Sequence, residues 1–232
     1  MAETIPVQII ARIHTDFATK FGVPRQSGLV ESLRGEIVFE PEFRNPDALR
    51  GIEDFSHLWL IWQFSEAVRD KWQPTVRPPR LGGNQSMGVF ATRSPYRPNP
   101  IGLSSVKLEG VEQRAGKGTV LIVSGADLMD GTPILDIKPY LPYADCRPDA
   151  TGGFTDAVAR KTLGVVLPDH LLTQIPEDKR QALHDVLAQD PRPAYQKDPA
   201  RQYGLTFAGY DVRFCVRDGV LTVTEVIKVN IS

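Results

Sequence analysis

The stretch Gly88-Val-Phe-Ala-Thr-Arg-Ser-Pro-Tyr-Arg-Pro-Asn-Pro-Ile-Gly-Leu-Ser104 holds three prolines in a short loop between two apolar runs. Each proline fixes its own φ and favours extended backbone at the residue before it. Such a loop has little conformational entropy left to lose, so the side chains that it carries are pre-organised. These include the polar side chains of Arg93, Arg97 and Asn99. A stiff connection between two strands explains the prolines, and the arginines and the amide indicate in addition a polar site for a ligand.

On both sides of this loop the chain consists of short runs that are rich in β-forming residues. The run 55–64 is apolar and aromatic and predicts a buried strand, while Asp218-Gly219 between two apolar runs predicts a β-hairpin. The remaining predicted strands are 7–13, 35–40, 87–92, 101–110, 118–125, 134–140, 210–216 and 220–229. Strands in close succession leave no room for crossover helices, so the pattern predicts an antiparallel barrel or sandwich.

The sequence pattern changes near residue 150, where the succession of short β-forming runs ends. Residues 150–154 are a plausible linker, and 171–189 follow as an amphipathic helix that starts near Pro176. We therefore expect two domains, a β-domain at 1–150 and a small α+β domain at 151–232.

Composition excludes several classes of protein. The chain has 232 residues, of which 41% are hydrophobic and 24% charged, as is usual for a globular protein. Its two cysteines, Cys146 and Cys215, form no disulfide scaffold, and its four histidines show no metal-ligand spacing. Neither a signal peptide nor a membrane-spanning run is present. These features predict a cytoplasmic protein without a metal and without a membrane partner.

Charge is unevenly distributed although the formal net charge is only −1. Between Arg69 and Arg97 there are six basic residues and one acidic residue, whereas between Asp127 and Asp149 there are five acidic and two basic residues. Two solvated faces explain this pattern. The alternative is a basic surface for a polyanion such as RNA beside an acidic pocket for a cationic cofactor.

A second dense motif, Asp127-Leu-Met-Asp-Gly-Thr-Pro-Ile-Leu-Asp-Ile-Lys-Pro-Tyr140, contains three carboxylates. Asp130-Gly131 predicts a tight turn, which needs no ligand to explain it. Turn chemistry does not explain three aspartates beside an apolar strand, because buried carboxylates need partners. We expect Asp127, Asp130 and Asp136 to lie near one another.

These two motifs, with Arg93-Ser-Pro-x-Arg97-Pro-Asn-Pro-Ile-Gly102 as the first, resemble the TsaA-like (YaeB/TrmO) family of tRNA threonylcarbamoyladenosine methyltransferases. The resemblance covers Val7 to about Pro148 and resumes at Asp190-Pro-Arg-Pro-Ala-Tyr195. It implies a single-sheeted antiparallel β-barrel, usually as a homodimer. It also implies S-adenosylmethionine as methyl donor, and a tRNA anticodon stem-loop as partner. The methylated atom would be the exocyclic nitrogen of threonylcarbamoyladenosine next to the anticodon.

The resemblance also implies a set of cofactor-binding residues. Ser65 and Glu66 stand where a His- or Gln-containing pair is expected, so only their backbone contacts are carried over. The full set is Pro24, Arg25, Gln26, Ser65, Glu66, Arg93, Leu103, Asp127, Leu128, Met129, Asp130, Gly131 and Thr132. Carboxylates and turn carbonyls suit the cationic part of a sulfonium cofactor, and an arginine suits its carboxylate.

The reaction itself predicts a proton acceptor, because a nitrogen conjugated to a carbonyl is a poor nucleophile until it loses its proton. Asp136 and Tyr140 are the candidates for this role. For tRNA phosphates the candidates are Arg77, Arg80 and Arg97, and for anticodon-loop nucleotides Arg192 and Tyr195. A helix stop with a proline-stiffened exit explains 190–195 equally well.

Two other functions remain open at this point. The first is a non-catalytic β-barrel that binds a small molecule or RNA. The second is a hydrolase or isomerase that uses the aspartate cluster, although the sequence shows no nucleophile–base pair and no metal ligands for it.

Overall fold

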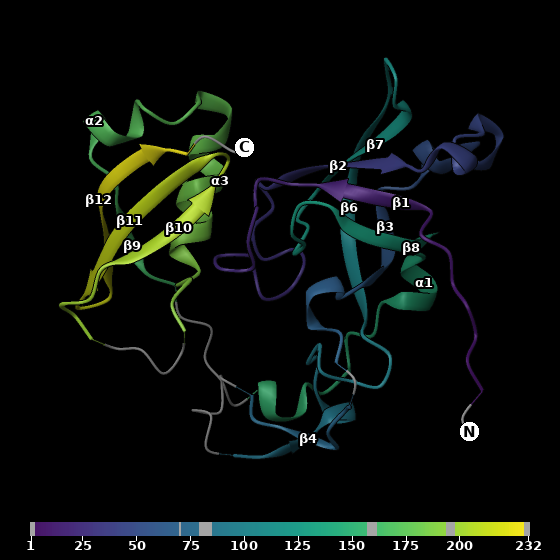
Figure 1. The fold of residues 1–232 in the computed structure, drawn as a ribbon, viewed down its shortest axis with the longest axis horizontal. Coiled ribbons are helices and arrows are strands. Elements are labelled where there is room, and N and C mark those ends of the chain that lie inside the picture. The colour runs from purple at the N-terminus through teal and green to yellow at the C-terminus, as the bar shows by residue number, and fades with distance from the viewer. Residues whose placement is uncertain (1–2, 70, 79–84, 157–161, 194–197, 230–232) are drawn as a thin grey trace.

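The computed structural model describes residues 3–69, 71–78, 85–156, 162–193 and 198–229 (Figure 1). Six of its strands form one antiparallel sheet: β1 (Ala11–His14), β2 (Arg34–Phe39), β3 (His57–Gln63), β6 (Ile101–Arg114), β7 (Gly118–Ser124) and β8 (Thr132–Pro139). Their order is β1-β2-β7-β6-β3-β8, and β8 pairs again with β1, so the sheet closes into a barrel. The predicted mainly β fold is confirmed.

Alternation of side chains along the strands builds the core of this barrel. In β3, Leu58, Leu60 and Trp62 are at most 7% exposed, while the residues between them face outward. In β6, Gly102 lies opposite Trp62, and a Cβ at this position would overlap the indole ring. The glycine therefore makes room for the tryptophan that fills this part of the barrel.

The C-terminal unit is a second, smaller sheet with one covering helix. Its strands β10 (Tyr203–Phe207), β11 (Tyr210–Arg217), β12 (Val220–Lys228) and β9 (Gly164–Val166) lie in that order, with β9 parallel to β12. The short helix α2 (Asp169–Leu172) and the longer α3 (Glu177–Ala188) complete the unit. Asp218 and Gly219 both have positive φ, as a two-residue hairpin turn requires, so the predicted hairpin is confirmed.

Some predicted elements were wrong in extent. The first strand spans only Ala11–His14, although Ile10 before it still donates to the Ile134 carbonyl and accepts from the Glu40 amide. The strand predicted at 87–92 is only β5 (Met87–Gly88), which pairs with β4 (Thr75–Val76), and the chain then forms a 3-10 turn. For the helix predicted at 171–189, the start near Pro176 is confirmed, since α3 begins directly after it at Glu177, while residues 169–172 form the separate short helix α2.

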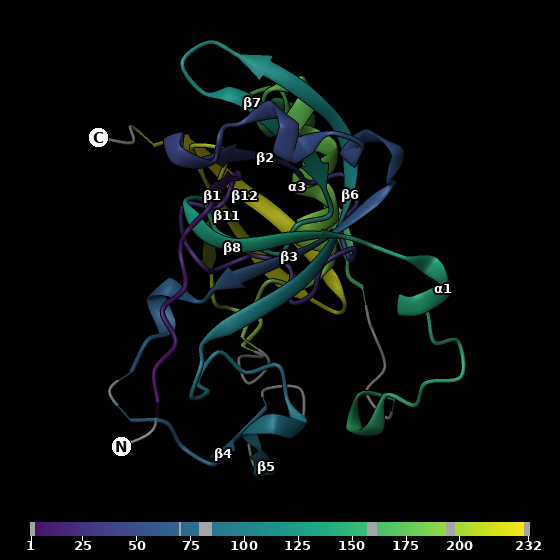
Figure 2. The ribbon, with the colours of Figure 1, turned by 90° about the vertical axis from the view of Figure 1, so that its right-hand side faces the viewer.

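The connections between strands are short turns and irregular segments. Their 3-10 turns are Pro41–Phe43, Pro46–Leu49, Ile52–Asp54, Ser65–Ala67, Val89–Ala91 and Gly153–Thr155, and α1 spans Pro142–Asp145. In both views the segments around β4 lie below the barrel (Figure 2). No helix in the described ranges has the length and apolar character needed to cross a membrane.

The segment between β1 and β2 reaches from the barrel to the C-terminal unit, as the purple trace between them shows in Figure 1. Phe17, Val30 and Leu33 of this segment are buried in the C-terminal core, not in the barrel core. The C-terminal core therefore includes residues from the N-terminal part of the chain. The division at residue 150 stays a prediction.

Candidate functional site

A large cleft of about 2020 Å³ opens between the barrel, the segments around β4 and β5, and the C-terminal unit. Its walls come from segments that lie far apart in the sequence, at 20–26, 62–69, 71–78, 86–98, 127–132, 151–155 and 186–193. The proline-rich loop and the aspartate motif therefore share one cavity.

Most of the predicted site residues line this cleft. They are Pro24, Arg25, Gln26, Ser65, Glu66, Arg77, Arg93, Arg97, Asp127, Leu128, Met129, Asp130, Thr132 and Arg192. Gly131, Leu103, Asp136 and Tyr140 are not among its lining residues. Arg80 and Tyr195 lie outside the described residues.

The two arginines of the proline-rich loop have different surroundings. Arg97 is half-buried and donates from Nη1 to the carbonyls of Thr92 at 3.0 Å and Ser94 at 3.3 Å. It braces its own loop, which leaves it poorly placed for the phosphate contact expected of it. Arg93 is exposed and donates to the side-chain oxygen of Gln26, a neutral partner.

A chain of two hydrogen bonds from the barrel interior fixes the carboxylate of Asp127 in the cleft wall. Ser104 Oγ donates to its Oδ1 at 2.5 Å and accepts from Trp62 Nε1 at 2.9 Å. Ser104 is fully buried, so this short chain of hydrogen bonds is shielded from water. Burial raises the pKa of Asp127, while the bond from Ser104 and the charge of Arg93 act against that rise.

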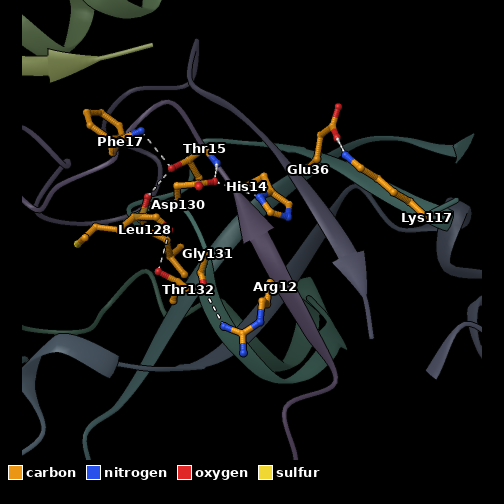
Figure 3. Close-up of polar contacts among 11 residues, drawn as sticks. Arg12, His14, Thr15, Phe17, Glu36, Lys117, Leu128, Asp130, Gly131 and Thr132 are labelled. Carbon is orange, nitrogen blue, oxygen red and sulfur yellow. Dashed lines mark hydrogen bonds and ion pairs between the residues drawn. The ribbon is translucent and has the colours of Figure 1, made fainter. Parts of the chain in front are cut away.

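The turn after Asp127 is anchored to the end of β1 (Figure 3). Asp130 Oδ1 accepts from the Thr15 amide and lies 3.1 Å from His14 Nδ1, while Arg12 Nη1 donates to the Gly131 carbonyl at 3.1 Å. Thr132 Oγ1 donates to the Met129 carbonyl at 2.8 Å. These contacts hold the turn in place and use Asp130 structurally, which leaves Asp127 to the cleft.

The three aspartates therefore do not form one cluster, contrary to expectation. Asp136 pairs with Lys138 at 2.9 Å and lines a separate cavity of about 300 Å³. It lies four residues along an extended strand from Thr132, roughly 13 Å at the rise of a β-strand. Residues that are close in sequence lie far apart in space when an extended strand separates them.

Tyr140 and Leu103 also lie away from the cleft walls. The Tyr140 ring packs near Trp59, with centroids 5.6 Å apart. Leu103 is 54% exposed, because β6 turns its neighbours Gly102 and Ser104 into the barrel and Leu103 outward. The catalytic roles of Asp136 and Tyr140 stay predictions, and their positions lend them no support.

Arg192 forms an ion pair with Asp190, two residues before it. Its Nε and Nη2 donate to the two oxygens of Asp190 at 2.7 and 2.8 Å, and this pairing raises the pKa of Arg192. The guanidinium is therefore engaged within the protein, while the Arg192 carbonyl accepts from Arg25 Nη2 at 3.2 Å.

The sequence reading missed an aromatic rim on the cleft. Trp72 is 50% and Phe90 72% exposed, with ring centroids 6.1 Å apart, and Arg69 lies 3.7 Å over the ring of Tyr96. Exposed aromatic rings that lie side by side favour a binding surface, whereas singly exposed apolar residues are common on any protein. The sequence does carry a signal, because Trp72, Phe90 and Tyr96 are interspersed among the basic residues of 69–97.

Comparison with known proteins identifies relatives along almost the whole chain. The family model for the tRNA-methyltransferase O N-terminal domain matches residues 12–146, and that for the TrmO C-terminal domain matches 162–229. A tRNA (adenine(37)-N6)-methyltransferase of Escherichia coli is 44% identical over 218 residues, which cover 90% of this chain and 92% of the relative. The enzyme of the same name from Eikenella corrodens is 48% identical over 177 residues, covering 76% and 99%.

Solved structures agree with the sequence matches. The crystal structure of TrmO from Pseudomonas aeruginosa superposes with a TM-score of 0.80 at 37% identity, over 98% of this chain and 99% of that one. A sequence relative from Pseudomonas aeruginosa, 44% identical over 91% of this chain and 92% of its own length, carries the name "Putative S-adenosylmethionine-dependent methyltransferase RcsF". The chain belongs to the tRNA-methyltransferase O family.

Proposed function

We propose that this protein transfers a methyl group from S-adenosylmethionine to the exocyclic N6 of adenine 37 in tRNA, with threonylcarbamoylated adenosine as the preferred base. The relatives named above support the reaction, and they favour it over a non-catalytic binding module. The observation that carries the proposal is the shared cleft, in which the carboxylate of Asp127 and the guanidinium of Arg93 meet beside an aromatic and basic rim.

The cleft fits S-adenosylmethionine in charge. When bound, this cofactor supplies an electrophilic methyl group on a sulfonium centre and carries a carboxylate. Arg93, whose partner is a neutral amide, is suited to hold that carboxylate. The segments Pro24–Gln26 and Asp127–Asp130 both line the cleft, and Pro24 and Leu128 add buried apolar surface for the nucleoside part. Ser65 and Glu66 also line it, in the 3-10 turn that follows β3.

Asp127 is our candidate for the proton acceptor, in place of Asp136 and Tyr140. It lies in the cleft, whereas the other two do not. Burial raises its pKa, which makes the ionised carboxylate a better proton acceptor, and the Trp62–Ser104 chain fixes its orientation. Its own task is to accept the N6 proton, which makes the nitrogen nucleophilic at the moment of transfer.

The aromatic rim is our candidate surface for the anticodon loop. Single-stranded RNA loops are recognised through unstacked bases, which stack on aromatic side chains and on arginine. Trp72 and Phe90 offer two exposed rings, and Arg69, Lys71 and Arg77 are exposed beside them for phosphates.

We further propose that the protein acts as a homodimer in the cytoplasm. The resemblance noted from its motifs supports the dimer, and two unpaired cysteines, Cys146 and Cys215, suit a reducing compartment. Light scattering on the purified protein tests the dimer, and a single mass of one chain at micromolar concentration would remove it.

The transfer assay tests the main proposal. Purified protein is incubated with S-adenosylmethionine and two tRNA preparations, one with and one without the threonylcarbamoyl group, and the tRNA is digested to nucleosides for mass spectrometry. Methylation of the threonylcarbamoylated nucleoside alone is expected. Methylation of the unmodified base alone would overturn the substrate, and cofactor binding without any transfer would favour the binding module.

A further inference from the structure

We propose that the C-terminal unit is a working part of the cofactor site, because its helix α3 and the adjoining Asp190–Arg192 strut hold the segment 16–33 that presents Pro24–Gln26 to the cleft. This inference rests on the proposed function only for the identity of the cofactor. The structural part concerns a loop of the N-terminal part whose shape depends on contacts made nearly 170 residues later in the sequence.

An apolar anchor ties the segment to the C-terminal core. Phe17, Val30 and Leu33 are 1–3% exposed within that core, and the Phe17 ring meets Phe207 edge-on with centroids 5.4 Å apart. Gly22 has φ +91°, and a Cβ there would overlap the side chain of Leu205. Three large buried side chains make undocking of this segment costly.

Polar contacts fix both ends of the segment to the same helix. Near its start, Asp16 pairs with Lys179 at 2.8 Å, and both side chains are under 30% exposed. Near its end, Ser32 Oγ donates to Asp185 Oδ2 at 2.6 Å. Since Lys179 and Asp185 are separated by about 9 Å of helix, α3 sets the spacing of the two loop ends.

The barrel holds the middle of the segment from the opposite side. The Gly28 amide donates to the Gly125 carbonyl at 2.8 Å, and Ser27 Oγ accepts from the Ser105 amide at 3.2 Å. Gln26 is bonded to Arg93. Between these two sets of anchors lie the residues that face the cleft.

The Asp190–Arg192 strut contacts the segment 16–33 at Arg25. Asp190 directly follows the last turn of α3, with φ +53°, and grips the guanidinium of Arg192 through both carboxylate oxygens. The fixed Arg192 carbonyl then accepts from Arg25 in the cofactor segment. Asp190 and Arg192 are thus positioning residues, since they act through Arg25 and not on the reacting groups.

This arrangement couples cofactor binding to the docking of the C-terminal unit. A ligand that binds only the ordered segment stabilises the docked C-terminal unit, and loosening the contacts with α3 lowers affinity for that ligand to the same degree. Once the ligand is saturating, the segment is ordered again and the chemical step proceeds at its normal rate. The expected signature is a change in cofactor affinity with little change in kcat.

The test compares the double variant Lys179→Ala/Asp185→Ala and Asp190→Ala with the control Arg213→Ala. Arg213 bridges Asp211 and Glu225 on the C-terminal sheet and makes none of the contacts with the segment described here. Calorimetry and kinetics give the Kd and KM for S-adenosylmethionine, kcat at saturation and the melting temperature. Hydrogen exchange of the peptide covering 25–30 is followed without cofactor.

We expect the double variant and Asp190→Ala to raise Kd and KM about tenfold, with kcat within about twofold, and to speed exchange at 25–30, as expected when charge-assisted hydrogen bonds are lost. The single variant Asp185→Asn keeps Lys179 and an acceptor for Ser32, so it should retain most of the affinity of the wild type for S-adenosylmethionine. Unchanged exchange and affinity in the double variant, or an equal change in Arg213→Ala, would overturn the inference. A wild-type protein that binds no cofactor would instead remove the proposed function, while the exchange data still decide whether α3 holds the segment.

Discussion

Ser104 donates a 2.5 Å hydrogen bond to Asp127 and at the same atom accepts one from Trp62, so a strand of the barrel interior orients the carboxylate that faces the cleft. Ser104 lies on β6 and Trp62 on β3, two strands that pair with each other. The orientation of Asp127 is therefore fixed by two paired strands of the barrel, as its proposed role as proton acceptor requires.

The first prediction concerns Asp127→Asn. The amide keeps the shape of the side chain and removes the proton acceptor, so kcat should fall about 100-fold or more, the usual contribution of a general base. The Kd for S-adenosylmethionine should change by less than about threefold. Steady-state kinetics and calorimetry measure both.

Asp136→Asn is the matched control, since Asp136 lies outside the cleft and pairs with Lys138. Its kcat should stay near that of the wild type. A collapse of cofactor binding in Asp127→Asn would make Asp127 a ligand of the cofactor, and a large loss in Asp136→Asn would return the catalytic role to that residue.

The second prediction is a pH dependence. The base must be ionised, and burial raises the pKa of Asp127, so activity should fall on the acid side at a pH above the ordinary titration range of an aspartate. Ser104→Ala removes a bond that lowers this pKa, so the acid limb of kcat should move to higher pH. A pH–rate profile of both proteins checks the direction, and a shift to lower pH contradicts it.

The same pKa has a consequence for stability. Because the folded-state pKa is raised, the folded protein favours the protonated carboxyl, and the ionised form destabilises it above that pKa. This destabilisation is complete above the folded-state pKa, shrinks as the pH falls from the folded-state to the unfolded-state pKa, and is absent below both. Asp127→Asn should therefore melt at a higher temperature than the wild type at pH 7, with the difference shrinking in acid, as calorimetric scans would show.

The strands of the barrel could be predicted from the sequence because one face of each is buried. In β3 the alternation of Leu58, Leu60 and Trp62 with outward residues is visible in the letters themselves. The region 87–92 misled, because its apolar residues Val89 and Phe90 belong to a 3-10 turn in which one is buried and the other 72% exposed. Composition does not reveal which apolar residues are buried in the core and which are exposed at a binding surface.

For the site, motifs identified the segments, but they do not show the contacts that individual side chains make. The turn Asp127–Thr132 and the loop around Arg93 do meet in one cleft. Yet Arg97 braces its own loop and Arg192 is held by Asp190, facts that depend on local backbone conformation. Ser104 gave no signal at all, because a serine on an alternating strand looks the same whether or not a carboxylate lies across from it.

The third prediction separates the two kinds of arginine at the cleft. Arg93→Ala should weaken S-adenosylmethionine binding, because it removes the cation opposite the cofactor carboxylate, and leave tRNA affinity within about twofold. Arg77→Ala should weaken tRNA binding and lower the slope of log K against log salt by about 1, without changing cofactor affinity. Calorimetry for the cofactor and filter binding at several salt concentrations distinguish them. Exchanged results would mean that the two surfaces are assigned the wrong way round.

The fourth prediction tests the aromatic rim. Trp72→Ala and Phe90→Ala should each raise the Kd for an anticodon stem-loop by about tenfold or more, since stacking of one base on an aromatic ring contributes about 1–3 kcal/mol. Tyr143→Ala is the control, because this ring is 85% exposed and is not a lining residue of the cleft. Its stem-loop affinity should stay unchanged. If neither rim variant affects the stem-loop but both alter the mass found by light scattering, the rings belong to the contact between two copies of this chain and the base-stacking role is wrong.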